Sequence, residues 1–455
     1  MSDFLHLLMC PNCKKTHLKD EKKALVCTSC GSEYPKTGNV AWLFENPKGE
    51  IADWQNRYHL FVDMTGLEVQ KLKFDSQSPN ISGKTKDRLL RLIQAKTEHS
   101  REVARILKPM DVKEEDGPKS ESLVGGTELP STQSLMGYYQ NVCRDWSYGD
   151  QENAICLEKV EEVLKEDKVL RNMGVIGSGA CRLAFDIHRK LKPSNTINTD
   201  INPYLLLVAS RLIQGKSVSL YDFPIAPINL ESTAVKLKCK APEILSENFH
   251  YCLADGMNPV FAKQSLDSLL TPWLIDIVPQ DLQLQALRYN HCLKDSGRWV
   301  NFGSLSFYHN DQKICYSIDE ALEIVENSGF KIEAYSHDDI PYLHSPYSCQ
   351  KRTEKVLTFS ARKVESKEPP AEEFTFLPDW LTNTSQPVPR ADKLNQQHMV
   401  HSMLGNVFSL VDDKNSIEDI AEAATFLKLP KDNAVAVIKN VLTKFFNDHQ
   451  KGNQF

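Results

Sequence analysis

The sequence contains no run of about 18 consecutive apolar residues, so we expect no membrane-spanning helix. Its first residues, MSDFLHLLMCPNC, lack the basic stretch and long apolar core of a secretory signal, which favours a cytoplasmic protein. The chain also has no excess of positive charge. Its net charge of −6 argues against general nucleic-acid binding. Without a signal, the twelve cysteines are expected to be reduced thiols that can bind metal, not disulfides.

The 455 residues are enough for two to four domains, and the composition changes several times along the chain. Apolar runs such as NMGVIG and LDSLLTPWLIDIV alternate with helical patterns, which predicts a doubly wound, Rossmann-like α/β domain. The expected parts are a cysteine-paired segment 1–45, a helical segment with a linker 46–132, the α/β domain 133–365, a Pro-rich linker 366–385, and a helical, winged-helix-like module 386–455.

Four of the cysteines form two paired units, CPNC and CTSC, separated by thirteen residues. Two such knuckles allow four thiolates to close a tetrahedron around a structural zinc ion. The predicted ligands are Cys10, Cys13, Cys27 and Cys30, with redox-active or free cysteines as the alternative. The segment resembles small zinc-ribbon proteins that activate RNA and protein methyltransferases, through CPNCK, LVCTSCGSEYP and the apolar exit VAWLF.

A glycine-containing loop, VIGSGACRLAFDIHRK, follows one expected strand and begins an expected helix. Gly177 and Gly179 would let the backbone approach a nucleotide closely, but Cys181 occupies the third glycine position of a dinucleotide fingerprint. About 20 residues later Asp200 ends the next strand, where a carboxylate can bind both ribose hydroxyls. The pattern fits S-adenosylmethionine at least as well as NAD, and an ordinary glycine turn is the alternative.

Two further acids follow apolar runs: Asp255 in YCLADGMNP and Asp276 in LLTPWLIDIVP. With Asp200 they would present three carboxylates at one edge of the sheet, although a single such acid is usually a cap or loop residue. An ionised carboxylate in an apolar segment is costly unless it has a partner. We therefore expect Asp276 to be unpaired until a substrate N–H group reaches it.

Several longer motifs resemble the carnosine N-methyltransferase family over residues 133–365: RDWS, GSGACRLAFDI, TDINPYLLLVAS, LADGMNP, SLLTPWLIDI and GRWVNFGSLSFYH. The resemblance implies a class I S-adenosylmethionine-dependent methyltransferase. It assigns the carboxylate clamp of the cofactor to Arg144 and an adjacent contact to Asn141, which stands where the family has Gln. The implied cofactor-binding residues are Asn141, Arg144, Gly177, Gly179, Asp200, Asp255 and Gly256.

The same resemblance implies that Asp276 and His309 are catalytic and face the imidazole of the methyl acceptor. A carboxylate that accepts one imidazole N–H fixes the tautomer and leaves the other nitrogen free to attack. The expected substrate-binding residues are Trp273, Tyr308, Tyr347, Lys351 and Arg352.

Lys351 and Arg352 stand where the family carries aromatic residues, and such cations favour an acceptor with a free α-carboxylate. Histidine, 5-thiohistidine as in ovothiol biosynthesis, and a histidine dipeptide such as carnosine are the expected small-molecule acceptors. Two other functions remain open: a protein or tRNA methyltransferase with a fused zinc-ribbon activator, and a non-catalytic cofactor-sensing scaffold. The sequence also leaves open a homodimer through the terminal domains.

Overall fold

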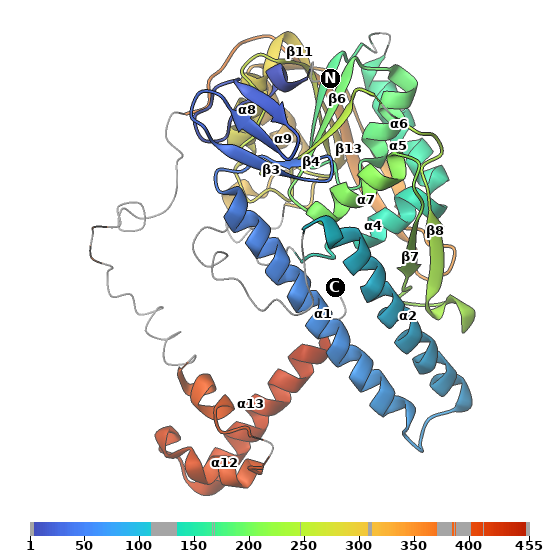
Figure 1. Cartoon of the computed structure of the whole chain (residues 1–455), viewed down its shortest axis with the longest axis vertical. Helices are drawn as coiled ribbons and strands as arrows, with labels where there is room; N and C mark the ends of the chain where they lie inside the picture. The colour runs from blue at the N-terminus through green and yellow to red at the C-terminus, as the bar shows by residue number, and fades with distance from the viewer. Residues whose placement is uncertain are drawn as a thin grey trace. The chain divides into compact units, whose positions relative to one another are not determined.

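The computed structural model describes residues 4–110, 134–165, 167, 169–245, 247–307, 312–370, 385, 387, 402–412 and 414–451, with side chains as far as 442. The chain divides into two compact units, Met1–Pro369 and Pro370–Phe455 (Figure 1). None of the described helices is long and apolar enough to cross a membrane.

The first unit is built around a large, mostly parallel sheet, as the alternating pattern predicted. Seven of its strands follow the order β9-β6-β5-β10-β11-β13-β12, in which only β13 is antiparallel to both of its neighbours. The chain extends the sheet from β5 toward β9 and then returns to add β10 on the other side of β5. The strands are β5 (Asn172–Ile176), β6 (Asn195–Asp200), β9 (Phe249–Leu253), β10 (Leu266–Pro272), β11 (Leu293–Ser304), β12 (Phe330–Tyr342) and β13 (Arg352–Lys363).

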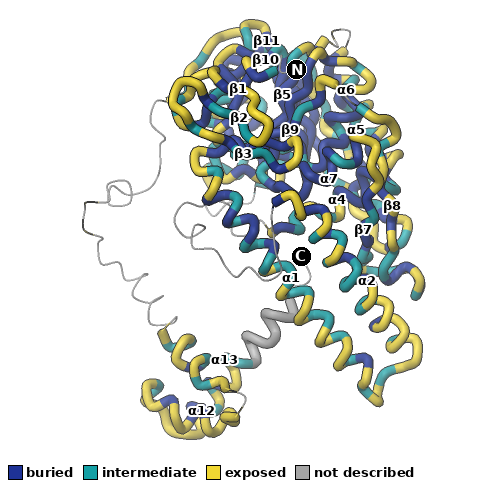
Figure 2. The backbone as a smooth tube through the Cα atoms, in the orientation of Figure 1, coloured by how far each residue is buried: buried dark blue, intermediate teal, exposed yellow. Residues whose placement is uncertain are grey.

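Polar residues occupy the middle of this sheet, and many of them are hydrogen-bonded, although Oδ1 of Asn198 has no partner among the described residues. Every residue of β6 (NTINTD) is buried, and its side chains bond to neighbouring strands and helices. Asn198 donates to the carbonyl of His250 at 3.0 Å, and Thr199 donates to the carbonyl of Val175 at 2.9 Å. Buried polar groups of this kind are tolerated because they are hydrogen-bonded. Figure 2 shows the central strands as the most buried part of the unit.

Helices cover the sheet and begin at residues suited to capping. Asn202 caps one helix and is followed by Pro203 at the first helical position, while Ser317 forms a capping box with Glu320. A five-residue π-helix, Arg144–Tyr148, links α4 to α5. The helices are α4 (Tyr139–Cys143), α5 (Asp150–Leu164), α6 (Arg182–Leu191), α7 (Pro203–Ile213), α8 (Leu282–Cys292) and α9 (Ile318–Asn327).

The N-terminal segment continues the same sheet. Strands β1 (Leu18–Glu21), β2 (Ala24–Cys27), β3 (Glu33–Thr37) and β4 (Val40–Trp42) pair in sequence, and β4 then pairs in parallel with β9. Leu43 adds a backbone hydrogen bond to Leu253 at 2.8 Å. The cysteine-bearing segment thus covers an edge that would otherwise be an unpaired strand, and the sheet has eleven strands.

Two long helices, α1 (Pro47–Ser76) and α2 (Gly83–Leu107), follow as an antiparallel pair (Figure 1). Trp54 on α1 and Val103 on α2 are buried against the first unit's core. Toward the connecting turn the pair becomes exposed, and Phe74 reaches 79% exposure. A separate two-stranded sheet of β7 (Val218–Asp222) and β8 (Val235–Cys239) packs beside α2.

The second unit contains a helix at 402–408, α12 (Ile417–Ala423) and α13 (Lys431–Lys451). Its small core consists of Val407, Ile420, Ala421, Ala424, Ala434 and Ile438. Among its described residues there is no strand, so the winged-helix-like module stays a prediction.

Candidate functional site

A cavity lies at the carboxyl ends of β5, β6, β9 and β10, where the strand order reverses. This is the position at which open α/β sheets bind ligands. The cavity has a volume of about 180 Å³, which is many times the volume that a single water molecule needs. The predicted residues that line it are Asn141, Arg144, Gly177, Gly179, Asp200, Asp255, Gly256 and Trp273.

The glycine loop is packed closely against the cavity wall at its first glycine. Gly177 has a φ of +69°, and a Cβ atom there would lie 2.5 Å from Cδ1 of Leu274. A side chain at this position would therefore meet both an unfavourable backbone conformation and the wall of the cavity. Cys181 also has a positive φ, 61°, at the start of α6, so the cysteine in the third glycine position adopts a conformation that glycine would favour.

Asp200 is the last residue of β6, and its carboxylate is 8% exposed. One oxygen accepts the N–H of Gly179 and the other accepts the N–H of Asn202, each at 2.8 Å. Burial raises the pKa of Asp200, and these backbone hydrogen bonds oppose the rise. Ile201 adds a third backbone N–H, and the two carboxylate oxygens have about four acceptor positions in all, so the group can still accept a hydrogen bond from a ligand.

Asp255 lies two residues beyond β9, in the loop that also brings Gly256 and Met257 to the cavity. It accepts the N–H of Met257 at 2.8 Å, which shapes the loop into a tight turn. The position therefore presents both a carboxylate and exposed backbone to a ligand.

Arg144 lines the cavity from the π-helix and is 5% exposed. Its Nε donates to Asp145 at 2.7 Å, and Nη1 lies 3.5 Å from Glu152. Within the described part of the chain, Nη2 has no hydrogen-bond partner. The guanidinium is thus held on one side and has donors left for an anionic ligand.

These observations fit the cofactor that the resemblance implies. Buried carboxylate oxygens at Asp200 suit ribose hydroxyls, the glycine loop leaves room for a close approach, and the remaining donors of Arg144 suit a carboxylate. S-adenosylmethionine carries both of the matching groups, the ribose hydroxyls and the methionine carboxylate.

The acceptor side is less simple. Trp273 lines the cavity with a φ of +52°, and its backbone packs so closely on β11 that a Cβ at Gly303 would lie 2.8 Å from Cα of Trp273. The run Leu269–Pro279 leaves the sheet at Pro272, so Asp276 sits in the following loop, not at the strand end. Asp276 itself is not among the residues that line the cavity.

Asp276 also has a partner, which corrects the expectation that it is unpaired. Its carboxylate is 6% exposed and accepts the N–H of Ser306 at 2.8 Å. Burial raises the pKa of Asp276, whereas hydrogen bonds from Ser306 and Ser304 oppose the rise. Asp276 lies near the cavity, because its neighbours Leu274 and Ile277 line it.

Of the remaining predicted acceptor residues, three are described, and none of these three lines the cavity. Tyr308 and His309 lie outside the described residues. Tyr347 and Lys351 do not line the cavity, and Lys351 is exposed. Arg352 does not line it either, but its guanidinium lies 4.8 Å from the ring centroid of Tyr342, which does.

Sequence reasoning missed Tyr342, Tyr138 and Asp145 as lining residues. The hydroxyl of Tyr342 accepts a hydrogen bond from Asn141 at 3.0 Å, and its ring packs against Trp273 at a centroid distance of 4.9 Å. The sequence predicts Tyr347 as a substrate-binding residue, five positions beyond the tyrosine that lines the cavity. No spacing signal marks Tyr342, because it lies at the end of a long edge strand.

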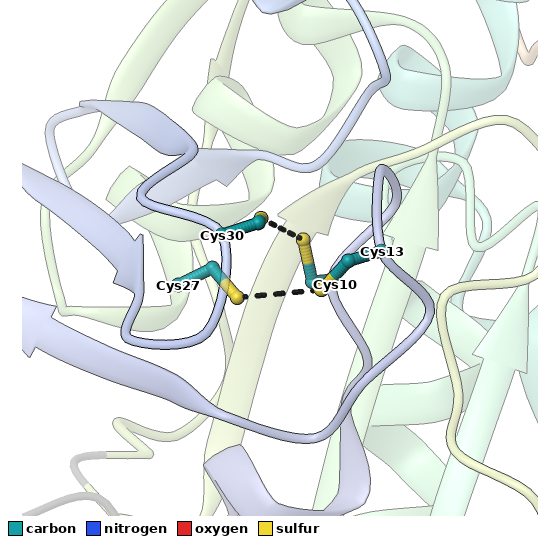
Figure 3. A group of neighbouring side chains, drawn as sticks. All are labelled: Cys10, Cys13, Cys27 and Cys30. Atoms are coloured by element: carbon teal, nitrogen blue, oxygen red, sulfur yellow. Dashed lines mark hydrogen bonds between the residues drawn. The ribbon is translucent and has the colours of Figure 1, made fainter.

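The four predicted zinc ligands converge, as Figure 3 shows. Their sulfur atoms all lie within 4.8 Å of one another, with Cys10–Cys30 and Cys13–Cys27 distances of 3.6 Å. Four thiolates bound tetrahedrally to zinc at about 2.3 Å would stand about 3.8 Å apart. The donor set and its geometry are therefore compatible with a structural metal site that has no open position.

Structural comparison finds remote likenesses. A chain of the complex between the Haloferax volcanii Trm112 methyltransferase activator and a putative methyltransferase is 10% identical, with 51% of this chain and 94% of that chain covered and a TM-score of 0.33. A putative S-adenosylmethionine-dependent methyltransferase from Listeria monocytogenes is 11% identical, with coverages of 47% and 99% and a TM-score of 0.32. Phosphoethanolamine N-methyltransferase 2 from Haemonchus contortus is 12% identical, with coverages of 51% and 58% and a TM-score of 0.33.

No curated protein sequence matches the chain. The assignment rests on a family model, described as carnosine N-methyltransferase, that matches residues 127–365. This range covers more than half of the chain and contains the whole cavity. The chain belongs to the carnosine N-methyltransferase family and is an S-adenosylmethionine-dependent N-methyltransferase.

Proposed function

We propose that the protein methylates an imidazole nitrogen of a small histidine-derived acceptor. The observation that carries this proposal is the Asp276 carboxylate, which is buried beside the cavity in a chain of this family and is held by the N–H of Ser306. A buried carboxylate attracts a hydrogen-bond donor strongly because water competes little for it. The imidazole N–H of a histidine derivative is such a donor.

Asp276 and His309 are proposed to have separate roles in methyl transfer. S-adenosylmethionine supplies an electrophilic methyl group when it is bound. Asp276 accepts the N–H of one imidazole nitrogen, so the lone pair of the other nitrogen points at the methyl group, and positioning supplies most of the catalysis. As the imidazole becomes a cation, the nearby carboxylate stabilises the developing charge. His309 is proposed to bind the acceptor or take the surplus proton.

The acceptor end offers a cation for the free α-carboxylate of a histidine derivative. Arg352 pairs with Glu354 and lies beside Tyr342 at the edge of the cavity. Histidine, 5-thiohistidine and carnosine all carry this carboxylate at the same place relative to the ring, and carnosine differs by a β-alanyl group on the α-amino nitrogen. The cation therefore supports all three acceptors, and the transfer experiment distinguishes them.

The deciding experiment incubates labelled S-adenosylmethionine with histidine, 5-thiohistidine, carnosine and a histidine peptide. Matched controls are the histidines already methylated at one or the other ring nitrogen. Neither should accept a methyl group, because one has its reacting nitrogen occupied and the other lacks the N–H that Asp276 is proposed to accept. Bulk tRNA and protein are assayed in parallel. Label in these polymers and in none of the imidazoles would favour the alternative, a protein or tRNA methyltransferase with a fused zinc ribbon.

We further propose that the four-cysteine cluster holds one structural zinc ion. The convergence of the sulfur atoms supports this, as does the hydroxyl of Tyr34, 2.8 Å from the sulfur of Cys10. Metal analysis of the purified protein should find about one zinc per chain. The Cys10→Ser variant should lose it, whereas a Cys349→Ser control, at an exposed cysteine outside the cluster, should retain it.

A further inference from the structure

The buried carboxylate of Glu152, in the first turn of α5, connects two sides of the cavity that are far apart in sequence. Its side chain is almost completely buried, and the residue is 5% exposed. One oxygen, Oε2, lies 3.5 Å from Nη1 of Arg144 and accepts the N–H of Leu343 at 3.0 Å. The other, Oε1, accepts the N–H of His344 at 2.8 Å. One carboxylate thus bridges a guanidinium and two consecutive backbone amides.

On the cofactor side, Glu152 helps to orient Arg144. The guanidinium is held at Nε by Asp145 and at Nη1 by Glu152, and it faces the cavity. Two carboxylates on different edges of a planar guanidinium fix its rotation as well as its position. Removal of either would allow the plane to turn.

On the other side, Glu152 holds the chain immediately after Tyr342. Leu343 has a φ of +55°, a left-handed conformation that is unfavourable for a leucine. Such a conformation persists only when surrounding contacts fix it, and the two amides bonded to Glu152 are among these contacts, together with the N–H of Ser345 on the carbonyl of Leu343 at 2.8 Å. Ser345 continues the anchoring by donating to the buried Asp222 at 2.6 Å.

We propose that Glu152 is a positioning residue that couples cofactor binding to the order of residues 342–344, of which Tyr342 lines the cavity. The inference rests on the proposed role of Arg144 as the clamp of the cofactor carboxylate. Because Oε2 contacts both Arg144 and Leu343, a ligand that fixes the guanidinium also fixes the carboxylate and the amides bonded to it. Such coupling is reciprocal, so ordering of 342–344 also favours cofactor binding.

The test follows amide hydrogen exchange over residues 342–350 with and without S-adenosylhomocysteine, a probe that needs no methyl acceptor. In the wild-type protein, the probe should slow exchange at Leu343 and His344. In Glu152→Gln the side chain keeps its volume but presents an NH₂ group toward one of the two amides. The factor by which the probe slows exchange at Leu343 and His344 should then be about tenfold smaller than in the wild type, which is the loss expected for one charge-assisted hydrogen bond.

The matched control is Glu158→Gln, the same substitution at an exposed position of the same helix, where exchange should match the wild type. The proposal is overturned if the probe protects residues 342–344 equally in Glu152→Gln and the wild type, or fails to protect them in the wild type. A uniform rise in exchange across the whole unit would also overturn it, since that reports only lost stability.

If Glu152→Gln fails to fold, Glu152→Asp replaces it, because the shorter carboxylate keeps the charge but cannot span both amides. The outcome is separable from the proposed function. Protection that depends on Glu152, in a protein that methylates none of the imidazoles, would leave the coupling standing and reject the acceptor.

Discussion

The two ends of the cavity are built differently. The cofactor end is made where strands stop: Asp200 is the last residue of β6, and Asp255 is two residues beyond β9. The acceptor end combines a loop residue, Asp276, four residues beyond β10, with Tyr342, the last residue of the edge strand β12, whose next residue, Leu343, bonds to Glu152. Strand ends are fixed by the sheet, whereas loops can change shape between relatives. Cofactor use should therefore be the stable property of this site and acceptor choice the adaptable one.

The largest expected effect lies at the acceptor end. Asp276→Asn keeps the size of the side chain and an oxygen for the N–H of Ser306, but it loses the charge that would stabilise an imidazolium. We expect turnover to fall by about 10²- to 10⁴-fold, while the dissociation constant of S-adenosylhomocysteine changes less than about twofold. Turnover on the most active imidazole and calorimetric titration of the cofactor product measure the two quantities.

Ser306→Ala is the control for this variant, because it removes an exposed hydroxyl but keeps the backbone N–H that Asp276 accepts. Its turnover should stay close to that of the wild type. If Asp276→Asn methylated the acceptor at the wild-type rate, the carboxylate would have no role in the mechanism.

A second variant addresses the cofactor end. Arg144→Lys keeps a positive charge but cannot donate to Asp145 and to a ligand carboxylate with one planar group. We expect the affinity for S-adenosylhomocysteine to fall about 10- to 100-fold. Equilibrium titration measures it, and adenosine, which lacks the methionine carboxylate, is the control ligand whose affinity should change little. Equal losses for both ligands would mean that Arg144 shapes the cavity without binding the carboxylate.

The cofactor end was predictable because its signals are local. Gly177, Gly179 and Asp200 belong to one strand–loop–helix–strand segment, and parallel pairing of β5 with β6 brings their positions together. The acceptor end depends on contacts across long stretches of sequence. Glu152 binds the amides of Leu343 and His344, nearly two hundred residues later, and no periodicity records that contact.

The fold shows the same difference. The α/β alternation and the cysteine pairs were predictable from the sequence, since each follows from spacing along the chain. The pairing of β4 with β9 was not predictable, because the paired residues Ala41 and Cys252 lie far apart in the sequence and meet only at the edge of the sheet. The ribbon was expected as a separate part, and a strand of three residues, Val40–Trp42, gives too short a pattern to show which edge it will join.

The pH dependence of cofactor binding should report on Asp200. Ribose hydroxyls donate to the ionised carboxylate, and burial raises the pKa of that group, against the opposing hydrogen bonds from Asn202 and Gly179. Affinity is therefore present above the raised pKa and is lost as the pH falls through it, by up to about tenfold per pH unit. Titrations of S-adenosylhomocysteine across the acid range measure the slope. Asp200→Asn should bind more weakly at neutral pH and lose this part of the slope, and an unchanged slope in the variant would assign it to another group.

The smallest effect is expected at the rim of the acceptor end. The side chain of Arg352 is 63% exposed and lies over the ring of Tyr342, so solvent weakens its attraction for a carboxylate. Arg352→Ala should raise KM for histidine by less than about fivefold, with no change for histamine, which lacks the carboxylate. Lys351→Ala is the matched control, since Lys351 is exposed and has no recorded contact with Tyr342 among the described residues. If Arg352→Ala instead weakened binding of S-adenosylhomocysteine, the two ends of the cavity would not be separate, because a residue of the acceptor rim would then be acting on the cofactor through Tyr342 and Asn141.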